Sequence, residues 1–219
     1  MSFVSDEAPC ALASVVELRE ILGEPTERAI LKQQSALDRH ARAFIGHSPF
    51  LVLSTASAAG TCDASPKGDV PGFVLVQDER TLVIPDRPGN RRADSLRNIL
   101  ENPHVGLLFL IPGMDETLRV NGSARVVEDP EVLAQLAVGG RAPKLAIVVS
   151  VEEAYLHCGK ALLRSHLWDA SRQMPRSEMP SLGQMIQDQL RPPDRTDEEH
   201  ARIVAEHERG TAEAYRRLY

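Results

Sequence analysis

TLVIPDRPGNRRADSLRNILENPHVGLLFLI, residues 81–111, is the stretch of sequence that decides the fold. Thr81 to Pro85 is a short apolar run with β-branched residues, which favours a strand. From Arg91 to Asn102 the apolar residues recur at helical spacing, which predicts a helix with one buried side. His104 to Ile111 is a second apolar run, and Pro112–Gly113 ends it. A strand, a basic turn, a helix and another strand therefore follow one another.

Further strands are expected on both sides of this stretch. Glu116 to Glu128 alternates apolar and polar residues, as a strand with one buried face does. The remaining expected strands are Phe50 to Ala56, Phe73 to Gln77 and Lys144 to Val151. So many strands with few helices between them predict a mainly antiparallel sheet closed as a barrel. Strict alternation of strand and helix, which is typical of a doubly wound fold, is absent.

Helical segments are expected at both ends of the barrel. Residues 1–47 form an N-terminal extension, whose apolar residues recur at helical spacing from residue 12 onward. The barrel covers residues 48–158. Residues 159–219 form a polar helical arm, punctuated by prolines, that we expect to pack on the barrel or on a partner subunit. The chain is thus expected to be a single domain over residues 1–219, of mainly β class with added helices.

The composition restricts the functions open to the chain. The formal net charge is −6 and aromatic residues make up 4%, so nucleic-acid binding lacks both a positive field and stacking surfaces. The longest apolar runs are far too short to span a bilayer. Three widely spaced cysteines without a C-x-x-C motif are typical of reduced thiols in a cytoplasmic protein. We expect a cytoplasmic protein that binds neither nucleic acid nor membrane, in which an anion site requires a local cluster of Arg and Lys.

The segment Asp86-Arg87-Pro88-Gly89-Asn90-Arg91-Arg92 is the most informative one for function. Asn90 is a favourable N-cap residue, which places Arg91 and Arg92 in the first turn of the expected helix. Cations are disfavoured there, because a helix N-terminus already carries partial positive charge. One interpretation is a phosphate site made of main-chain N–H groups, the helix dipole and two guanidinium groups. The other is a solvated basic turn whose charge is offset by Asp94.

Two other polar segments are candidates, and each also has an ordinary structural interpretation. Ser65 and Lys67 lie in a polar turn that offers a hydroxyl and an ammonium group, but such a turn is common at a protein surface. Thr117 and Arg119 lie on the polar face of the long strand, which usually points to water. They would contact a ligand only if that strand borders a cleft.

The C-terminal part of the chain contains one more candidate segment, which runs from Lys160 through Arg164 to Trp168. A lone tryptophan is more often a packing residue than a cofactor contact. His200 and His207 share one helix face but have no evident third ligand, so we expect a solvated face and no metal site. The sequence also lacks the G-x-S-x-G, H-E-x-x-H and G-x-G-x-x-G motifs.

The order of these segments resembles the pyridoxamine 5′-phosphate oxidase-like flavoproteins, which have the FMN-binding split-barrel fold. The resemblance covers residues 48–128 best and rests on the runs FLVLSTAS, CDASPKGD, TLVIPDRPGNRRADSLRNILENPHVGLLFLI and TLRVNGSARVV. Its most specific part extends from Gly89 and the two arginines to Asn102-Pro103 and the strand that follows. The resemblance implies an antiparallel split β-barrel of the FMN-binding type. It also implies a homodimer with two FMN sites at the subunit interface.

The resemblance further implies roles for individual residues. The two arginines match the family's phosphate-binding basic pair, and Ser65 and Lys67 fall in the strand that contacts the phosphate and ribityl chain. Pro85 and Asp86 match positions that line the flavin, Thr117 matches a polar residue near the ring, and a C-terminal segment covers the partner's flavin. The expected cofactor-binding residues are Ser65, Lys67, Pro85, Asp86, Arg87, Asn90, Arg91, Arg92, Thr117, Arg119, Lys160, Arg164 and Trp168.

The implied function is that of an FMN-dependent oxidoreductase acting on an unidentified small molecule or a nicotinamide nucleotide. The flavin supplies the redox chemistry in such a protein, and a cation such as Arg119 or Lys160 can stabilise the anionic reduced ring. The sequence RSHLW at 164–168 does not reproduce the family's Arg-Leu-x-x-x-Arg-like substrate signature. This argues against a vitamin B6 substrate. The alternative is a non-catalytic carrier of flavin, deazaflavin or haem with the same fold.

Overall fold

Seven antiparallel strands form one sheet in a computed structural model that describes residues 11–216 and Tyr219. Residues 1–10 of the expected N-terminal extension, including Cys10, lie outside the described residues. The strand order is β2-β1-β5-β6-β7-β4-β3. The strands are β1 (Phe50–Ala56), β2 (Cys62–Gly68), β3 (Leu75–Val76), β4 (Thr81–Pro85), β5 (His104–Leu110), β6 (Thr117–Val127) and β7 (Ala146–His157).

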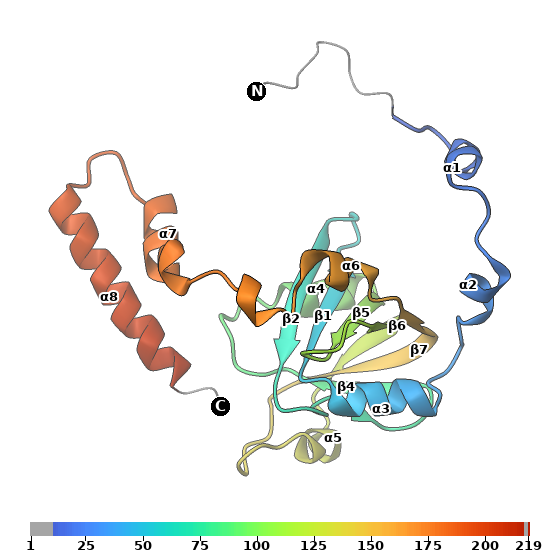
Figure 1. Ribbon diagram of the computed structural model, residues 1–219. Helices are drawn as coiled ribbons and strands as arrows, with labels where there is room; N and C mark the ends of the chain where they lie inside the picture. The colour runs from blue at the N-terminus through green and yellow to red at the C-terminus, as the bar shows by residue number, and fades with distance from the viewer. Residues whose placement is uncertain (1–10, 217–218) are drawn as a thin grey trace.

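The sheet curves into a split barrel, because β2 and β3 end the strand order without pairing with each other in the described part of the chain (Figure 1). All of the ladders between neighbouring strands are antiparallel. This confirms the expected antiparallel split β-barrel. The N- and C-terminal helical extensions are also present.

The core fills the inside of the curved sheet. Side chains that point inward from the strands are almost fully buried, including Leu53, Phe109 and Val120. Helix α3 (Arg39–His47) covers one opening with Phe44 and Ile45. Burial of these large apolar side chains stabilises the barrel, at roughly 1.5–3 kcal/mol for each fully buried one.

A β-bulge interrupts the central pairing of β6 with β7 between Asn121 and Gly122. A Cβ atom built on Gly122 would lie 2.0 Å from the main-chain oxygen of Ser150. Only glycine therefore permits this close approach of the two strands. The bulge lets β6 and β7 curve strongly enough for the barrel to form.

Two sequence-based expectations about local structure were wrong. Ser65–Asp69 was expected to be a turn, but most of it belongs to β2, where Pro66 pairs with Val52 of β1. Proline is tolerated there because β2 is an edge strand. The helix expected over 91–102 is α4 (Asp94–Glu101), so the basic residues precede it.

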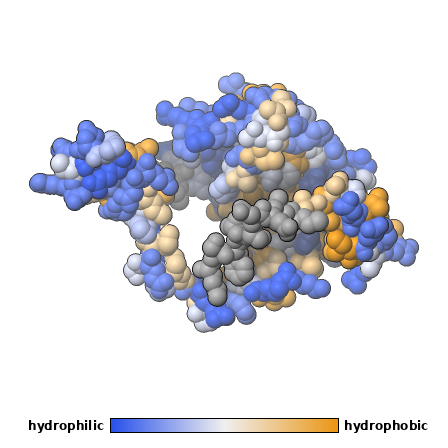
Figure 2. All heavy atoms as spheres, turned by 90° about the horizontal axis from the view of Figure 1, so that it is seen from above, coloured by the Kyte–Doolittle hydropathy of each residue, from blue (hydrophilic) through white to orange (hydrophobic). Residues whose placement is uncertain are grey.

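The N-terminal extension contains two short helices before α3, namely α1 (Val15–Leu22) and α2 (Glu27–Leu31). Neither helix buries a residue. Apolar side chains of α1 gather on the surface, and Val15 and Leu22 are about 70% exposed (Figure 2). The extension meets the barrel at an isolated bridge between Gln34 and Ala154.

The C-terminal arm leaves the barrel after β7, extends away from it and returns at its end (Figure 1). Its helices α7 and α8 pack side by side, and His200 of α8 is buried with its Nε2 2.7 Å from the Asp188 carboxylate. None of the helices in the described residues is long and apolar enough to cross a membrane. The remaining elements are α5 (Pro130–Gln135), α6 (Lys160–Ser165), α7 (Leu182–Gln189), α8 (Asp197–Tyr215) and two 3₁₀ turns at Ala170–Arg172 and Arg176–Glu178.

Candidate functional site

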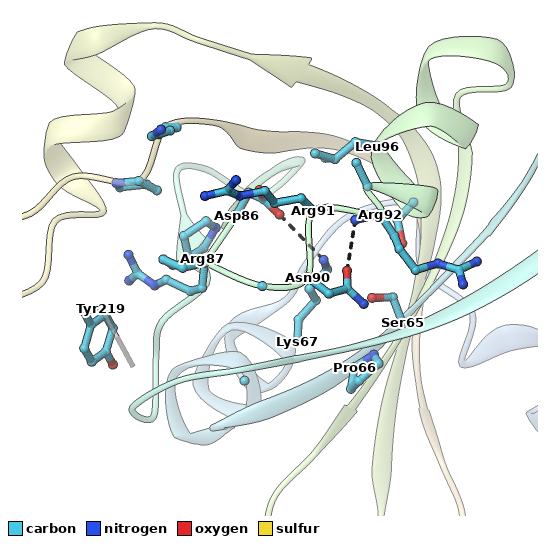
Figure 3. A pocket seen from close by; sticks show the side chains of 18 of the residues that line it. Ser65, Pro66, Lys67, Asp86, Arg87, Asn90, Arg91, Arg92, Leu96 and Tyr219 are labelled. Carbon is cyan, nitrogen blue, oxygen red and sulfur yellow. Dashed lines mark hydrogen bonds and ion pairs between the residues drawn. The ribbon is translucent and has the colours of Figure 1, made fainter. Parts of the chain in front are cut away.

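A cavity of about 930 Å³ lies between the edge strand β2, the loop that joins β4 to α4, and the segment that leads into β7 (Figure 3). This volume is typical of a site for a cofactor or a small molecule. Eight of the residues expected to bind the cofactor line it. They are Ser65, Lys67, Pro85, Asp86, Arg87, Asn90, Arg91 and Arg92.

Positive charge dominates the lining of the cavity. Six basic side chains line it against two acidic ones, Asp86 and Asp94, although the whole chain has a formal net charge of −6. A concentration of positive charge in a concave site attracts an anionic ligand. The basic residues are Lys67, Arg87, Arg91, Arg92, Arg141 and Lys144.

The basic loop before α4 has a different backbone from the expected one. Asn90 is not the N-cap: its Oδ1 accepts the main-chain N–H of Arg92 at 3.0 Å, while Arg91 and Ala93 adopt left-handed φ angles of 64° and 56°. Left-handed residues cannot continue a right-handed helix, so α4 begins only at Asp94. A backbone that alternates in hand turns successive N–H groups toward one side, as in the loops that bind anions.

The two adjacent arginines are not equivalent. The Arg92 Nε donates to the Asp94 carboxylate at 2.8 Å, and its side chain is 74% exposed. The pKa of Arg92 is raised by this hydrogen bond to Asp94 and by the charge of the same carboxylate. Arg91 makes no side-chain hydrogen bond or ion pair within residues 11–216 and Tyr219, and it lines the cavity. Arg91 is therefore the better placed of the two to bind an anion.

Strand β2 provides the opposite wall of the phosphate end. Ser65 and Lys67 alternate with exposed neighbours along the strand, so both face inward. The Lys67 Nζ lies 3.8 Å from the Asp86 Oδ1, a long contact between two largely buried side chains. Figure 3 shows Lys67 and Ser65 facing the loop that carries Asn90. The strand thus places one ammonium group and one hydroxyl group beside the loop.

Hydrogen bonds between α4 and the strands hold this wall in position. The buried Ser95 hydroxyl donates to Asp63 of β2 at 3.0 Å. Asn98 donates to Thr55 of β1, also at 3.0 Å. Because these bonds join α4 directly to β1 and β2, the loop before α4 has a fixed place relative to β2.

A buried ion pair closes the other end of the cavity. The Arg87 Nε donates to the Asp69 carboxylate at 2.6 Å, and these side chains are 17% and 1% exposed. Arg87 also donates to the main-chain oxygen of Leu136 at 2.9 Å. Tyr219 completes the group, since its hydroxyl donates to Asp69 and its ring lies 5.7 Å from the Arg87 guanidinium carbon.

This network changes the acidity of its members. Burial by itself raises the pKa of the Asp69 carboxyl, but the hydrogen bonds from Tyr219, the Val70 main chain and Arg87 outweigh it and lower the pKa below its usual value. The hydrogen bond to Asp69 raises the pKa of the Tyr219 hydroxyl. Asp69 is therefore ionised at neutral pH and compensates the charge of Arg87.

Five of the expected cofactor-binding residues lie away from this cavity in the same chain. Thr117 is buried opposite His157 in the β6–β7 ladder. The Arg119 guanidinium carbon lies 5.2 Å from the centre of the Tyr155 ring, and the Trp168 Nε1 donates to the main-chain oxygen of Met114 at 2.9 Å. The other two residues, Lys160 and Arg164, belong to α6. None of the five lines the cavity.

Four lining or supporting residues did not follow from the sequence: Asp69, Arg141, Lys144 and Tyr219. Arg141 and Lys144 stand in a short segment before β7 that matches no motif, and Tyr219 is far from the other residues in sequence. A weak signal was available at 139–141, because two glycines before a basic residue predict a tight turn.

The fold and the site place the chain in the class of antiparallel split barrels with a basic, cofactor-sized cavity. A family model described as pyridoxamine 5′-phosphate oxidase matches residues 37–158, more than half of the chain. The chain belongs to this family. No curated protein matches the chain.

Several solved structures are similar to part of the chain. HupZ of Group A Streptococcus is 17% identical, with 55% of this chain and 99% of that one covered and a TM-score of 0.45. HutZ, a heme storage protein from Vibrio cholerae, is 17% identical, with coverages of 55% and 93% and a TM-score of 0.40. An FMN-binding protein from Syntrophomonas wolfei is 13% identical, with coverages of 66% and 97% and a TM-score of 0.42.

Proposed function

We propose that this chain is an FMN-dependent oxidoreductase and that FMN binds in the cavity by its phosphate group. The observation that carries the proposal is the excess of basic side chains around the loop before α4, in a chain whose net charge is −6. Membership of the pyridoxamine 5′-phosphate oxidase family supports the choice of a flavin among possible anionic cofactors.

The residues at the loop suit a phosphate group. Arg91 and Lys67 supply positive charge, Ser65 supplies a hydroxyl donor, and the left-handed loop supplies main-chain N–H groups. Hydrogen bonds between charged partners contribute about 1.5–3 kcal/mol each. Arg92 adds positive charge from farther away, because Asp94 already engages it.

The adjoining wall suits the rest of the cofactor. Pro85 is buried at the end of β4 and offers an apolar surface, while the Asp86 carboxylate can accept a hydrogen bond from a ribityl hydroxyl. Asp86 is positioned by its main-chain N–H, which donates to the Leu145 oxygen at 3.0 Å. When bound, FMN would supply the hydride chemistry, and these residues would bind and orient it.

We further propose a homodimer in which the second group of expected residues reaches the partner's cofactor. Thr117, Arg119 and Trp168 lie together near the start of β6 and after α6, away from the cavity of their own chain. In the dimer, Arg119 or Lys160 would place positive charge near the flavin and stabilise its reduced, anionic form. The substrate would be a small molecule or a nicotinamide nucleotide.

A cytoplasmic location is part of the same proposal. Cys62 and Cys158 are exposed and free thiols, which persist in a reducing compartment.

The test begins with the absorption spectrum of the natively purified protein and the identification of its released cofactor by mass spectrometry. A flavin spectrum with FMN released, bleached by NADH or NADPH and restored by air, is the expected result. The variant R91A/R92A should be purified without stoichiometric FMN. Retention of the yellow colour by this variant contradicts the phosphate assignment. Bound FMN that no electron donor reduces favours a carrier, and a haem Soret band replaces the flavin proposal with haem binding.

A further inference from the structure

The cavity has a second basic end, distinct from the loop that carries Arg91. Figure 3 shows Tyr219 and Arg87 at one side of the cavity, with Ser65 and Pro66 at the other. Arg141 and Lys144 also line the cavity, from the segment that leads into β7. Pairing of β4 with β7 places this segment beside Arg87, since Pro85 pairs with Ala146.

A tight turn holds Arg141 in place. Gly139 and Gly140 have φ angles of 56° and 77°, which suit a two-residue hairpin turn with both central residues left-handed. Val138 and Arg141 close this turn with two main-chain hydrogen bonds, of 3.1 and 3.0 Å. Arg141 therefore projects from a fixed backbone, so binding a ligand there does not require ordering a loop.

The charges at this end are largely uncompensated. The Arg87 charge is balanced by the buried Asp69, so Arg87 shapes the wall but has little free charge. Lys144 makes no side-chain hydrogen bond or ion pair within the described residues. The single side-chain hydrogen bond of Arg141 there goes to the main-chain oxygen of Tyr219, at 2.9 Å.

Tyr219 occupies the position that an anion would take. Its main-chain oxygen accepts from Arg141, and its ring faces Arg87. Its hydroxyl donates to Asp69. These contacts come from three separate parts of the fold, and they hold a segment distant in sequence across one end of the cavity.

We infer that Arg141 and Lys144 form a second anion-binding position, which takes the phosphate or carboxylate group of a small molecule, and that this ligand displaces Tyr219. The position rests on the proposed function only in that FMN is assigned to the other end of the cavity. A substrate with an anionic group would thus be held at one end while its reacting part faces the cofactor. Tyr219 competes with the ligand and raises the concentration that is needed.

The test is calorimetric titration of inorganic pyrophosphate into the full-length protein saturated with FMN. The expected result is binding of pyrophosphate without release of FMN. In R141A/K144A the affinity for pyrophosphate should fall at least about tenfold, as removal of a charge-assisted hydrogen bond predicts. The affinity for FMN should stay within about twofold of the wild-type value. The control R42A/R202A removes the same charge from exposed sites outside the cavity and should leave both affinities unchanged.

Tyr219 variants test the displacement. Y219A loses the ring and the hydroxyl that anchor the segment, so pyrophosphate should bind several-fold more tightly. Y219F keeps the ring over Arg87 and loses only the bond to Asp69, so its affinity should lie between the two. Weaker binding in Y219A contradicts displacement, because it would make Tyr219 part of the site.

The outcomes separate this inference from the proposed function. The second position is overturned if FMN-loaded wild-type protein does not bind pyrophosphate, or if the control loses as much affinity as R141A/K144A. It is also overturned if R141A/K144A loses FMN to the same extent, because the two ends would then be one site. If FMN itself does not bind, the proposed function fails. The second position then stands only if pyrophosphate binding depends on Arg141 and Lys144 and not on Arg91.

Discussion

Replacing Arg91 by alanine should weaken FMN binding much more than replacing its neighbour Arg92. Arg91 has no partner among the described side chains, so all of its charge is available to a phosphate. Its loss removes one charged hydrogen bond, worth about 1.5–3 kcal/mol, which corresponds to an affinity lower by roughly 10- to 150-fold. Arg92 is 74% exposed and already bonded to Asp94. Its replacement should therefore change the affinity by less than about fivefold.

The assay is quenching of flavin fluorescence, with FMN titrated into apo-protein of each variant at one fixed ionic strength. D94N provides a third measurement, because it frees Arg92 from its partner and should partly restore binding in the R91A background. Circular dichroism checks that each variant keeps the wild-type fold. Equal losses in R91A and R92A, or a larger loss in R92A, would refute the conclusion that the loop orients only one arginine toward the phosphate.

Three further predictions concern the barrel, the buried ion pair and the dimer. G122A should lower the free energy of unfolding by about 3 kcal/mol in thermal melts, because its Cβ would lie 2.0 Å from a main-chain oxygen of β7, whereas G46A, with nothing within 4 Å, should be neutral or slightly stabilising. D69N should destabilise the protein by about 3 kcal/mol at pH 7, because it leaves the Arg87 guanidinium unpaired. The lowered pKa of Asp69 means that its carboxylate stabilises the fold above its unfolded pKa. The difference between wild type and D69N in urea unfolding should therefore shrink as the pH falls through the folded pKa, and a difference that grows at low pH would be inconsistent with this. FMN should quench the fluorescence of Trp168, the single tryptophan of the chain, if α6 and its following segment reach the partner's cofactor, and unchanged emission on stoichiometric binding would contradict that placement.

Most of the barrel could be predicted from local pattern. Strands β1, β5 and β6 are apolar or alternating runs, and such runs form strands because one or both of their faces must be buried. The edge strand β2 was missed, since CDASPKG contains a proline and almost no apolar residues. It is a strand because β1 offers it hydrogen-bonding partners from Phe50 to Ala56.

The candidate site was predicted in part. Ser65, Lys67 and the basic loop were singled out, and the fold brings them to one cavity. The local backbone was not predictable, because Asn90 had two alternatives: capping a helix or accepting the N–H of Arg92 in a loop. The loop geometry prevails, and it separates the roles of two adjacent arginines.

The sequence by itself determined the class of fold, the position of the basic loop and the family resemblance, because these depend on hydrophobic periodicity and on residues that are neighbours in the chain. The tertiary structure alone decided that Arg141, Lys144 and Tyr219 share a cavity with that loop. Their proximity depends on the pairing of β4 with β7 and on the return of the C-terminal arm. Contacts of this kind join residues far apart along the chain, so no local pattern encodes them, and they form only when the sheet and the arm fold together.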